Sequence, residues 1–240
     1  MKIIFNHLEK TGGTTLHFFF ENIFKKKIYL RNPHHFILEY INTFNIISIR
    51  NPFDIYKSLY LYGCEKKGGL YNSLKKKNET SFYDCSQEEY VNFLKFIYKE
   101  YRIKQKLNLV CGLATQRFLR SSLSKIDFQE LILIKDYKCL KNFFLNKKKF
   151  NFVIKNESLI SDLEKIILYF EKKTELACLL EKNYKEKFYK NINIKKNSTR
   201  EENKMKINNE LLPAETKNLI FEKEKLIFEL FYPEIIKNNL

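Results

Sequence analysis

The chain is poor in several residue types and lacks long apolar runs, and these scarcities limit the classes of protein to which it can belong. Its 240 residues include no Trp, six Gly and four Pro. No apolar run approaches the roughly 18 residues that a membrane-spanning helix needs. The first apolar stretch, residues 3–5, is too short for a secretory signal sequence. We therefore expect a cytoplasmic protein with no transmembrane segment.

Cysteine usage argues against a disulfide-stabilised protein and against a zinc-binding protein. The five cysteines are an odd number, and no two of them form a C-x-x-C pair. No group of His and Cys residues has the spacing of a zinc site, so we expect no metal. The simplest interpretation is a set of reduced, mostly buried thiols.

Arginine is rare, although 44 Lys and Arg against 28 Asp and Glu give a formal net charge of +16. Such a charge would suit an anionic partner. The lysines are scattered, however, and Asn, Ile and Phe are also abundant, which favours a lysine-rich composition as the source of the bulk charge. The few arginines are less typical of surface filler, and those of interest are Arg50, Arg117, Arg120 and Arg200.

The pattern of apolar residues predicts the fold. Hydrophobic residues make up 44% of the chain, enough for a packed core. Short apolar runs predict strands over 3–5, 27–30, 44–49 and 152–154. Helical spacing predicts helices over 14–20, 52–62, 87–106, 112–122, 136–146, 158–171 and 213–232, and polar composition predicts loops over 63–84 and 183–210. We expect one α/β domain over 1–240, a P-loop-like, three-layer parallel sheet flanked by helices, with a helix-rich C-terminal half.

A glycine loop follows the first strand, in the sequence HLEKTGGTT from His7 to Thr15. Glycines let backbone N–H groups curl around an anion, and the next helix contributes its positive N-terminal end. Hydroxyls of Thr14 and Thr15 and the charge of Lys10 could join them. A Walker A loop has its Lys after the glycines, so an ATP or GTP site fits poorly. The alternative interpretation is a tight strand-to-helix turn that contains two glycines.

A second motif begins where the third strand ends. Arg50 could make a forked contact with a phosphate, and Ser58 lies eight residues later on the following helix. The alternative interpretation is an arginine that ends a strand and a serine on a solvated helix face.

Together the two motifs resemble those of the PAPS-dependent sulfotransferases (PAPS is 3′-phosphoadenosine 5′-phosphosulfate). The carbohydrate branch, which includes heparan sulfate 2-O-sulfotransferase and bacterial relatives, is the most similar. The resemblance implies that PAPS is the co-substrate and that residues 10–15 (Lys10, Thr11, Gly12, Gly13, Thr14 and Thr15) bind its 5′-phosphosulfate end. It implies that Arg50 and Ser58 hold the 3′-phosphate, and that Ser198 and Arg200 lie in a basic loop that closes over the nucleotide. Glu9 in place of Pro, Asn51 in place of Asp and Ile55 in place of a second Arg depart from the family pattern.

The same resemblance implies an enzyme that moves the sulfuryl group to a hydroxyl, on a carbohydrate or another acceptor, by in-line transfer without a metal. Lys10 would stabilise the leaving phosphate, and His35 or His34 would be the base, since His34-His35-Phe36 resembles the family's His-Phe segment. Glu9 or Glu65 is the alternative base. Gln116, Arg117, Arg120 and the 63–84 loop would recognise the acceptor, and their cations would suit an acidic one.

Two other classes of function remain open at this stage. A P-loop small-molecule kinase is disfavoured because Lys10 precedes the glycines and because no convincing magnesium-binding Asp follows an apolar strand. A basic nucleic-acid-binding protein would use the charged surface with stacked Tyr and Phe. Our expectation is a sulfotransferase with no nucleic-acid partner.

Overall fold

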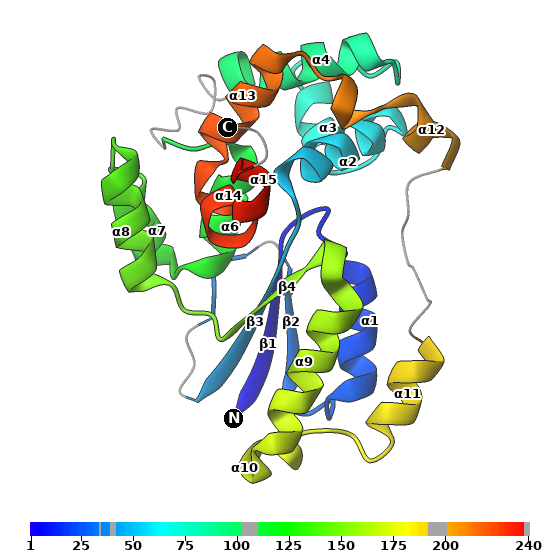
Figure 1. Cartoon of the computed structure of the whole chain (residues 1–240), viewed down its shortest axis with the longest axis vertical. Coiled ribbons are helices and arrows are strands. Elements are labelled where there is room, and N and C mark those ends of the chain that lie inside the picture. The colour runs from blue at the N-terminus through cyan, green and yellow to red at the C-terminus, as the bar shows by residue number, and fades with distance from the viewer. Residues whose placement is uncertain (34, 39–41, 102–109, 192–200, 238–240) are drawn as a thin grey trace. The chain divides into compact units, whose positions relative to one another are not determined.

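The computed structural model describes the chain except for residues 34, 39–41, 102–109, 192–200 and 238–240. Its elements (Figure 1) group into two compact units, each assembled from three segments. The first unit is Met1–Arg50, Arg117–Gln129 and Phe144–Ser198, and the second is Asn51–Gln116, Glu130–Phe143 and Thr199–Leu240. A single domain over the whole chain stays a prediction.

A parallel sheet forms the first unit's centre. In the described residues its strands are β1 (Lys2–His7), β2 (Tyr29–Pro33), β3 (Thr43–Ile49) and β4 (Phe152–Lys155), in the order β2-β1-β3-β4. His7, at the end of β1, pairs with Pro33 on one side and Ser48 on the other. The predicted α/β fold with a parallel sheet is confirmed, and each of the four predicted strands is present. Its P-loop-like character stays a prediction.

Helices α1 (Gly13–Ile23) and α9 (Leu159–Lys172) lie along the sheet (Figure 1) and share one apolar core with it. Side chains from alternate positions of the strands, among them Ile3, Phe5 and Ile46, are fully buried in this core. Residues 3–8 are all buried, which explains why the first strand is a continuous apolar run in place of an alternating pattern. The core therefore fixes β1 and the segment that follows it.

The remaining helices complete both units. The first unit also contains α10 (Thr174–Ala177) and α11 (Tyr184–Asn191). The second contains α2 (Pro52–Cys64), α3 (Gly69–Lys75), α4 (Gln87–Phe96), α12 (Glu201–Lys206), α13 (Ala214–Lys223), α14 (Lys225–Phe231) and α15 (Pro233–Lys237). The boundaries between the units fall within three helices, α6 (Leu113–Ser122), α7 (Lys125–Leu131) and α8 (Tyr137–Lys147).

Two segments predicted as loops contain helices, so those predictions were wrong. The 63–84 segment contains α3, which buries Leu70, Tyr71 and Leu74. The 183–210 segment contains α11 and α12. In both, Lys and Asn residues outnumber the few apolar residues and hide their helical spacing.

Other boundaries also differ. The predicted strand 27–30 begins at Tyr29, because Ile28 N–H bonds to Lys25 O at 3.0 Å in a turn. The prediction missed α7, although Ser124 and Asp127 form a capping pair: Asp127 N–H donates to Ser124 Oγ at 3.1 Å, and Ser124 Oγ to Asp127 Oδ2 at 2.7 Å. The predicted helix 87–106 is α4 followed by a π-helical turn over Ile97–Tyr101, beyond which residues 102–109 are not described.

The predicted helix 213–232 is broken at Glu224, which separates α13 from α14. Its fully buried carboxylate lies at the N-terminus of α6, where Oε2 accepts from Thr115 N at 2.7 Å and Oε1 from Ala114 N at 3.3 Å. The hydroxyls of Tyr56 and Tyr98 also donate to Oε1. A buried acid with several donors replaces the helix continuation that the apolar spacing indicates.

Replacing Glu224 by Gln should destabilise the protein by about 1–3 kcal/mol, because an amide NH₂ group would face the Thr115 N–H donor. The loss should also depend on pH. Burial raises the pKa of Glu224, although the surrounding donors oppose the shift. Its stabilising contribution is therefore full below the unfolded pKa of about 4.3 and is lost as the pH rises towards the folded pKa. Urea unfolding at several pH values should show the gap between wild type and Glu224→Gln narrowing from pH 4 to pH 7. The exposed Glu222→Gln should show no gap, and a Glu224→Gln gap that widens with pH would contradict the assignment.

Candidate functional site

The loops at the carboxyl ends of the strands define the candidate site, which lies in the first unit. The chain runs from β1 outwards to β2 and then returns to β3 on the other side of β1. Ligands of open parallel sheets bind at such a reversal, outside the carboxyl ends of the strands. The glycine loop leaves β1 at this edge, and Arg50 directly follows β3. The two motifs found in the sequence thus meet at neighbouring strand ends.

The buried side chain of Thr11 forms hydrogen bonds within the glycine loop and to β3. It is fully buried, its Oγ1 donates to Leu8 O at 2.9 Å, and the same atom lies 2.6 Å from Ser48 Oγ on β3. This hydroxyl is used within the fold. A contact between Thr11 and an anion would therefore come from its backbone amide.

Both glycines are required by their surroundings. Gly12 has a φ of 77°, in the left-handed region, and a Cβ there would lie 2.6 Å from Asn156 Oδ1. A Cβ on Gly13 would collide with the ring of His7. His7, which is buried under the loop, therefore packs against the start of α1, and Asn156 at the end of β4 packs over Gly12.

The loop leads directly into the first turn of α1. Gly12 is the N-cap and provides no side-chain hydrogen bond to it. Thr14 is partly exposed in this turn, whereas Thr15 is buried. The N-terminus of a helix is the positive end of its dipole, which favours an anion.

Arg50 joins the loop from β3. Its Nη1 approaches Lys10 O at 3.4 Å, and Lys10 itself has a left-handed φ of 69°. The Nε of Arg50 is buried, and within the described part of the chain it has no hydrogen-bond partner. A permanently charged group with an unused donor is therefore close to the backbone of the glycine loop.

Glu9 forms an ion pair that the sequence did not indicate. Its Oε2 lies 2.9 Å from Arg117 Nη1, and both side chains are less than a quarter exposed. The Glu9 carboxylate is thus engaged by Arg117, and its role as the alternative base stays a prediction. Arg117, predicted to recognise the acceptor, pairs with this acid beside the loop, and its contact with an acceptor stays a prediction. Glu65, the other carboxylate considered, lies in the second unit and pairs with Lys67 Nζ at 3.0 Å.

His35 follows β2 at the same edge of the sheet. It is exposed, two residues after Pro33, and the turn around it is held by a hydrogen bond from Asn32 Nδ2 to Phe36 O at 2.8 Å. The Arg120 guanidinium lies over the Phe36 ring, 5.0 Å from its centroid, and Arg120 is exposed. This edge therefore carries an accessible imidazole with an arginine near it.

The other predicted site residues are not placed there. His34, Ser198 and Arg200 lie outside the described residues. Ser58 is on α2, in the second unit, and its contact with a phosphate stays a prediction. Gln116, predicted to recognise an acceptor, is buried in that unit and donates to Cys111 O at 3.2 Å.

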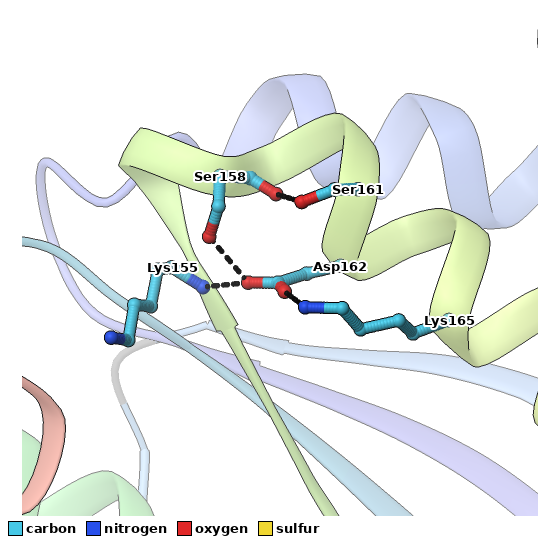
Figure 2. A network of polar contacts seen from close by, with 5 residues as sticks. All are labelled: Lys155, Ser158, Ser161, Asp162 and Lys165. Carbon is cyan, nitrogen blue, oxygen red and sulfur yellow. Dashed lines mark hydrogen bonds and ion pairs between the residues drawn. The ribbon is translucent and has the colours of Figure 1, made fainter.

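Figure 2 shows the polar network around Asp162, where β4 leads into α9. The buried carboxylate of Asp162 accepts from Lys155 N at 3.0 Å and from Ser158 Oγ at 2.8 Å, and it pairs with Lys165 Nζ at 2.8 Å. These contacts fix the turn from β4 into α9, in which Asn156 lies. The sequence contained the signal, an Asp four residues after a Ser at a helix start, but the long-range contact with Gly12 had no local trace.

Comparison of the chain with protein-family models, with curated proteins and with solved structures finds no significant match. Among the described residues no cluster of three or more His, Cys, Asp or Glu side chains has a metal-binding arrangement. No helix in the described part of the chain has both the length and the apolar character to cross a bilayer.

Proposed function

We propose that the chain is a sulfotransferase that moves the sulfuryl group of PAPS to a hydroxyl of a carbohydrate. The observation that carries the proposal is the meeting of Arg50 and the Lys10 backbone at the ends of adjacent parallel strands. Two cationic residues, a helix N-terminus and a glycine loop at one sheet edge suit an anion with more than one charged group.

In this proposal the loop amides and Lys10 hold the 5′-phosphosulfate, and Arg50 holds the 3′-phosphate. The acceptor oxygen forms a bond to sulfur while the bond between sulfur and the leaving phosphate oxygen breaks. Lys10 neutralises the charge that develops on this phosphate. The acceptor proton passes to a base, for which the exposed His35 is the best-placed imidazole among the described residues.

The order of the loop also supports this choice over a kinase. The loop has its lysine before the glycines, and this lysine stands at a left-handed backbone position directly beside Arg50. Lys10 thus lies between β1 and the glycines in the sequence, unlike the Walker lysine, which stands at the start of the helix.

The function is tested first by ligand binding. The desulfonated product, 3′-phosphoadenosine 5′-phosphate, should raise the Tm of the full chain. At a concentration of 100 times its Kd, it should increase the free energy of unfolding by about 2.7 kcal/mol. ATP and a single-stranded oligonucleotide at the same concentration should have little effect. Stabilisation by ATP alone would favour the kinase, and salt-sensitive stabilisation by the oligonucleotide alone would favour the nucleic-acid binder.

Replacing Arg50 by Ala should weaken binding of the same nucleotide by about 1.5–3 kcal/mol, because a charge-assisted contact with the 3′-phosphate is lost. Calorimetric titration measures this loss. Arg120→Ala, which removes an exposed arginine of the same unit, is the matched control and should bind normally. Unchanged affinity in a folded Arg50→Ala variant would show that the second motif has been misinterpreted.

A further inference from the structure

Cys64 and Cys85 belong to the second unit and are separated in the sequence by α3, but contacts of their neighbouring residues bring the two segments together. Tyr60 is one helical turn before Cys64 on α2, so the two side chains share a face. The Tyr60 hydroxyl donates to Ser86 O at 3.1 Å and lies 3.4 Å from Asp84 Oδ1. Residues on both sides of Cys85 are therefore held against the last turn of α2.

A second set of contacts holds the same turn. The Tyr83 ring stacks on the Tyr60 ring, with centroids 5.8 Å apart. Tyr83 also occupies the space that a Cβ on Gly63 would need, so only glycine fits before Cys64. Ser86 N–H donates to Asp84 Oδ1 at 2.8 Å and closes the turn around the second cysteine.

The two thiols themselves interact. Burial raises the pKa of the Cys64 thiol to about 12, and the charge and hydrogen bonding of Cys85 add to the shift. Both cysteines are partly exposed, which corrects the expectation of mostly buried thiols, since only Cys111 of the five is buried. Cys85 has a left-handed φ of 68°, rare for a residue with a side chain, so the surrounding contacts hold it in this orientation.

We propose that Cys64 and Cys85 are a redox modification site, which a low-molecular-weight disulfide converts into a disulfide bond that fastens α3 and its flanking turns to the end of α2. The proposal goes beyond the sulfotransferase assignment and does not depend on it.

The reaction is two successive thiol–disulfide exchanges. The Cys85 thiolate attacks one sulfur of the small disulfide, breaks its S–S bond and releases one small thiolate. The Cys64 thiolate then attacks the Cys85 sulfur and releases the second. Two protein thiols lose two electrons, the small disulfide gains them, and the two cysteine protons end on the released thiols. Cys85 reacts first because the raised pKa of Cys64 leaves little of the Cys64 thiol in the thiolate form. Cys64 attacks second, when the mixed disulfide at Cys85 lies next to it.

The bond would stabilise a segment that has few other anchors. Within α3 the buried side chains are Leu70, Tyr71 and Leu74, and the residues after them, 75–78, are all exposed. Joining the two ends of this segment removes conformations from the unfolded chain. We therefore expect the oxidised protein to have a Tm about 5–10 °C above that of the reduced protein.

The test is equilibration of the folded, full-length protein in mixtures of reduced and oxidised glutathione, followed by acid quenching, alkylation and peptide mass spectrometry. Peptides joined through Cys64 and Cys85 should exceed those of any other cysteine pair at least tenfold. The free thiols should fall from five to three, and dithiothreitol should restore both the thiols and the lower Tm.

Cys139→Ser, which removes an exposed cysteine of the same unit, should keep the joined peptide and the Tm shift. Cys64→Ser and Cys85→Ser should each lose both, and two variants guard against a fold defect in either one. The proposal is overturned if glutathione yields only mixed disulfides or scrambled pairs. It is equally overturned if the joined peptide is no more abundant than in protein oxidised in concentrated guanidinium chloride, or if it forms without raising the Tm.

Discussion

Replacing Lys10 by Ala should lower the rate of sulfuryl transfer by about 10²–10³-fold and leave the affinity for 3′-phosphoadenosine 5′-phosphate within about threefold. The reason lies in when the charge is needed. The leaving phosphate gains negative charge as its bond to sulfur breaks, so a cation beside it stabilises the transition state more than the ground state. Single-turnover rates with PAPS and calorimetric titration with the product nucleotide separate the two quantities.

The backbone at position 10 supplies the control. Lys10 has a left-handed φ of 69°, so Lys10→Ala keeps the same backbone strain, whereas Lys10→Gly relieves it. Both variants remove the ammonium group and should lose rate equally. Lys2→Ala removes an exposed lysine of the same unit and should react normally. Equal losses of rate and nucleotide affinity would make Lys10 a simple binding residue, and recovery of the rate in Lys10→Gly would indicate that backbone strain, and not charge, was responsible.

The strands and the glycine loop were predictable because their signals are local. A buried parallel strand is a short apolar run, and Gly12 is needed by the left-handed turn in which it stands. The position of Arg50 next to this loop also followed from topology, because parallel strands end at the same sheet edge.

What could not be predicted are the contacts between residues far apart in the sequence. Glu9 finds Arg117, and Asn156 covers Gly12, and neither pairing leaves a pattern in the neighbouring residues. These contacts change the interpretation of the site, since the ion pair gives the acid beside the glycine loop a cationic partner within the fold.

Glu224 and Cys64 illustrate the same limit in the second unit. The apolar spacing over 213–232 is helical on both sides of Glu224, so the break depends on the α6 N-terminus that its carboxylate accepts from. No short spacing joins the cysteines in the sequence, yet contacts of Tyr60 with Tyr83 and Ser86 bring the segment around Cys85 to the end of α2. In both cases the side chain is explained by residues that are distant in the sequence and that come near it only when the chain folds.

The placement of His35 supports a role in proton transfer. Pro33 pairs with His7, so the turn after β2 begins at the strand end where the glycine loop also begins. Asn32 Nδ2 donates to the O of Phe36, the residue after His35, and His35 is exposed. His17, by contrast, bonds to the Tyr29 hydroxyl at 2.8 Å, and burial lowers its pKa, so it is used within the fold.

Replacing His35 by Ala should therefore lower the transfer rate by about 10²–10⁴-fold, the usual contribution of a positioned proton acceptor, and leave binding of 3′-phosphoadenosine 5′-phosphate unchanged. An acceptor hydroxyl loses its proton with difficulty near neutral pH, and imidazole is the side chain that takes up protons most readily in this range. The measurement is transfer from PAPS to a panel of acidic and neutral glycans, with His35→Ala, His34→Ala and Glu9→Gln assayed together and His17→Ala as the matched imidazole control. A large loss in His35→Ala alone assigns the base to His35, and a large loss in His34→Ala alone moves it to the neighbouring residue. If both of these variants keep full activity while Glu9→Gln is inactive, the base is a carboxylate, and the Glu9–Arg117 pair must open during the reaction.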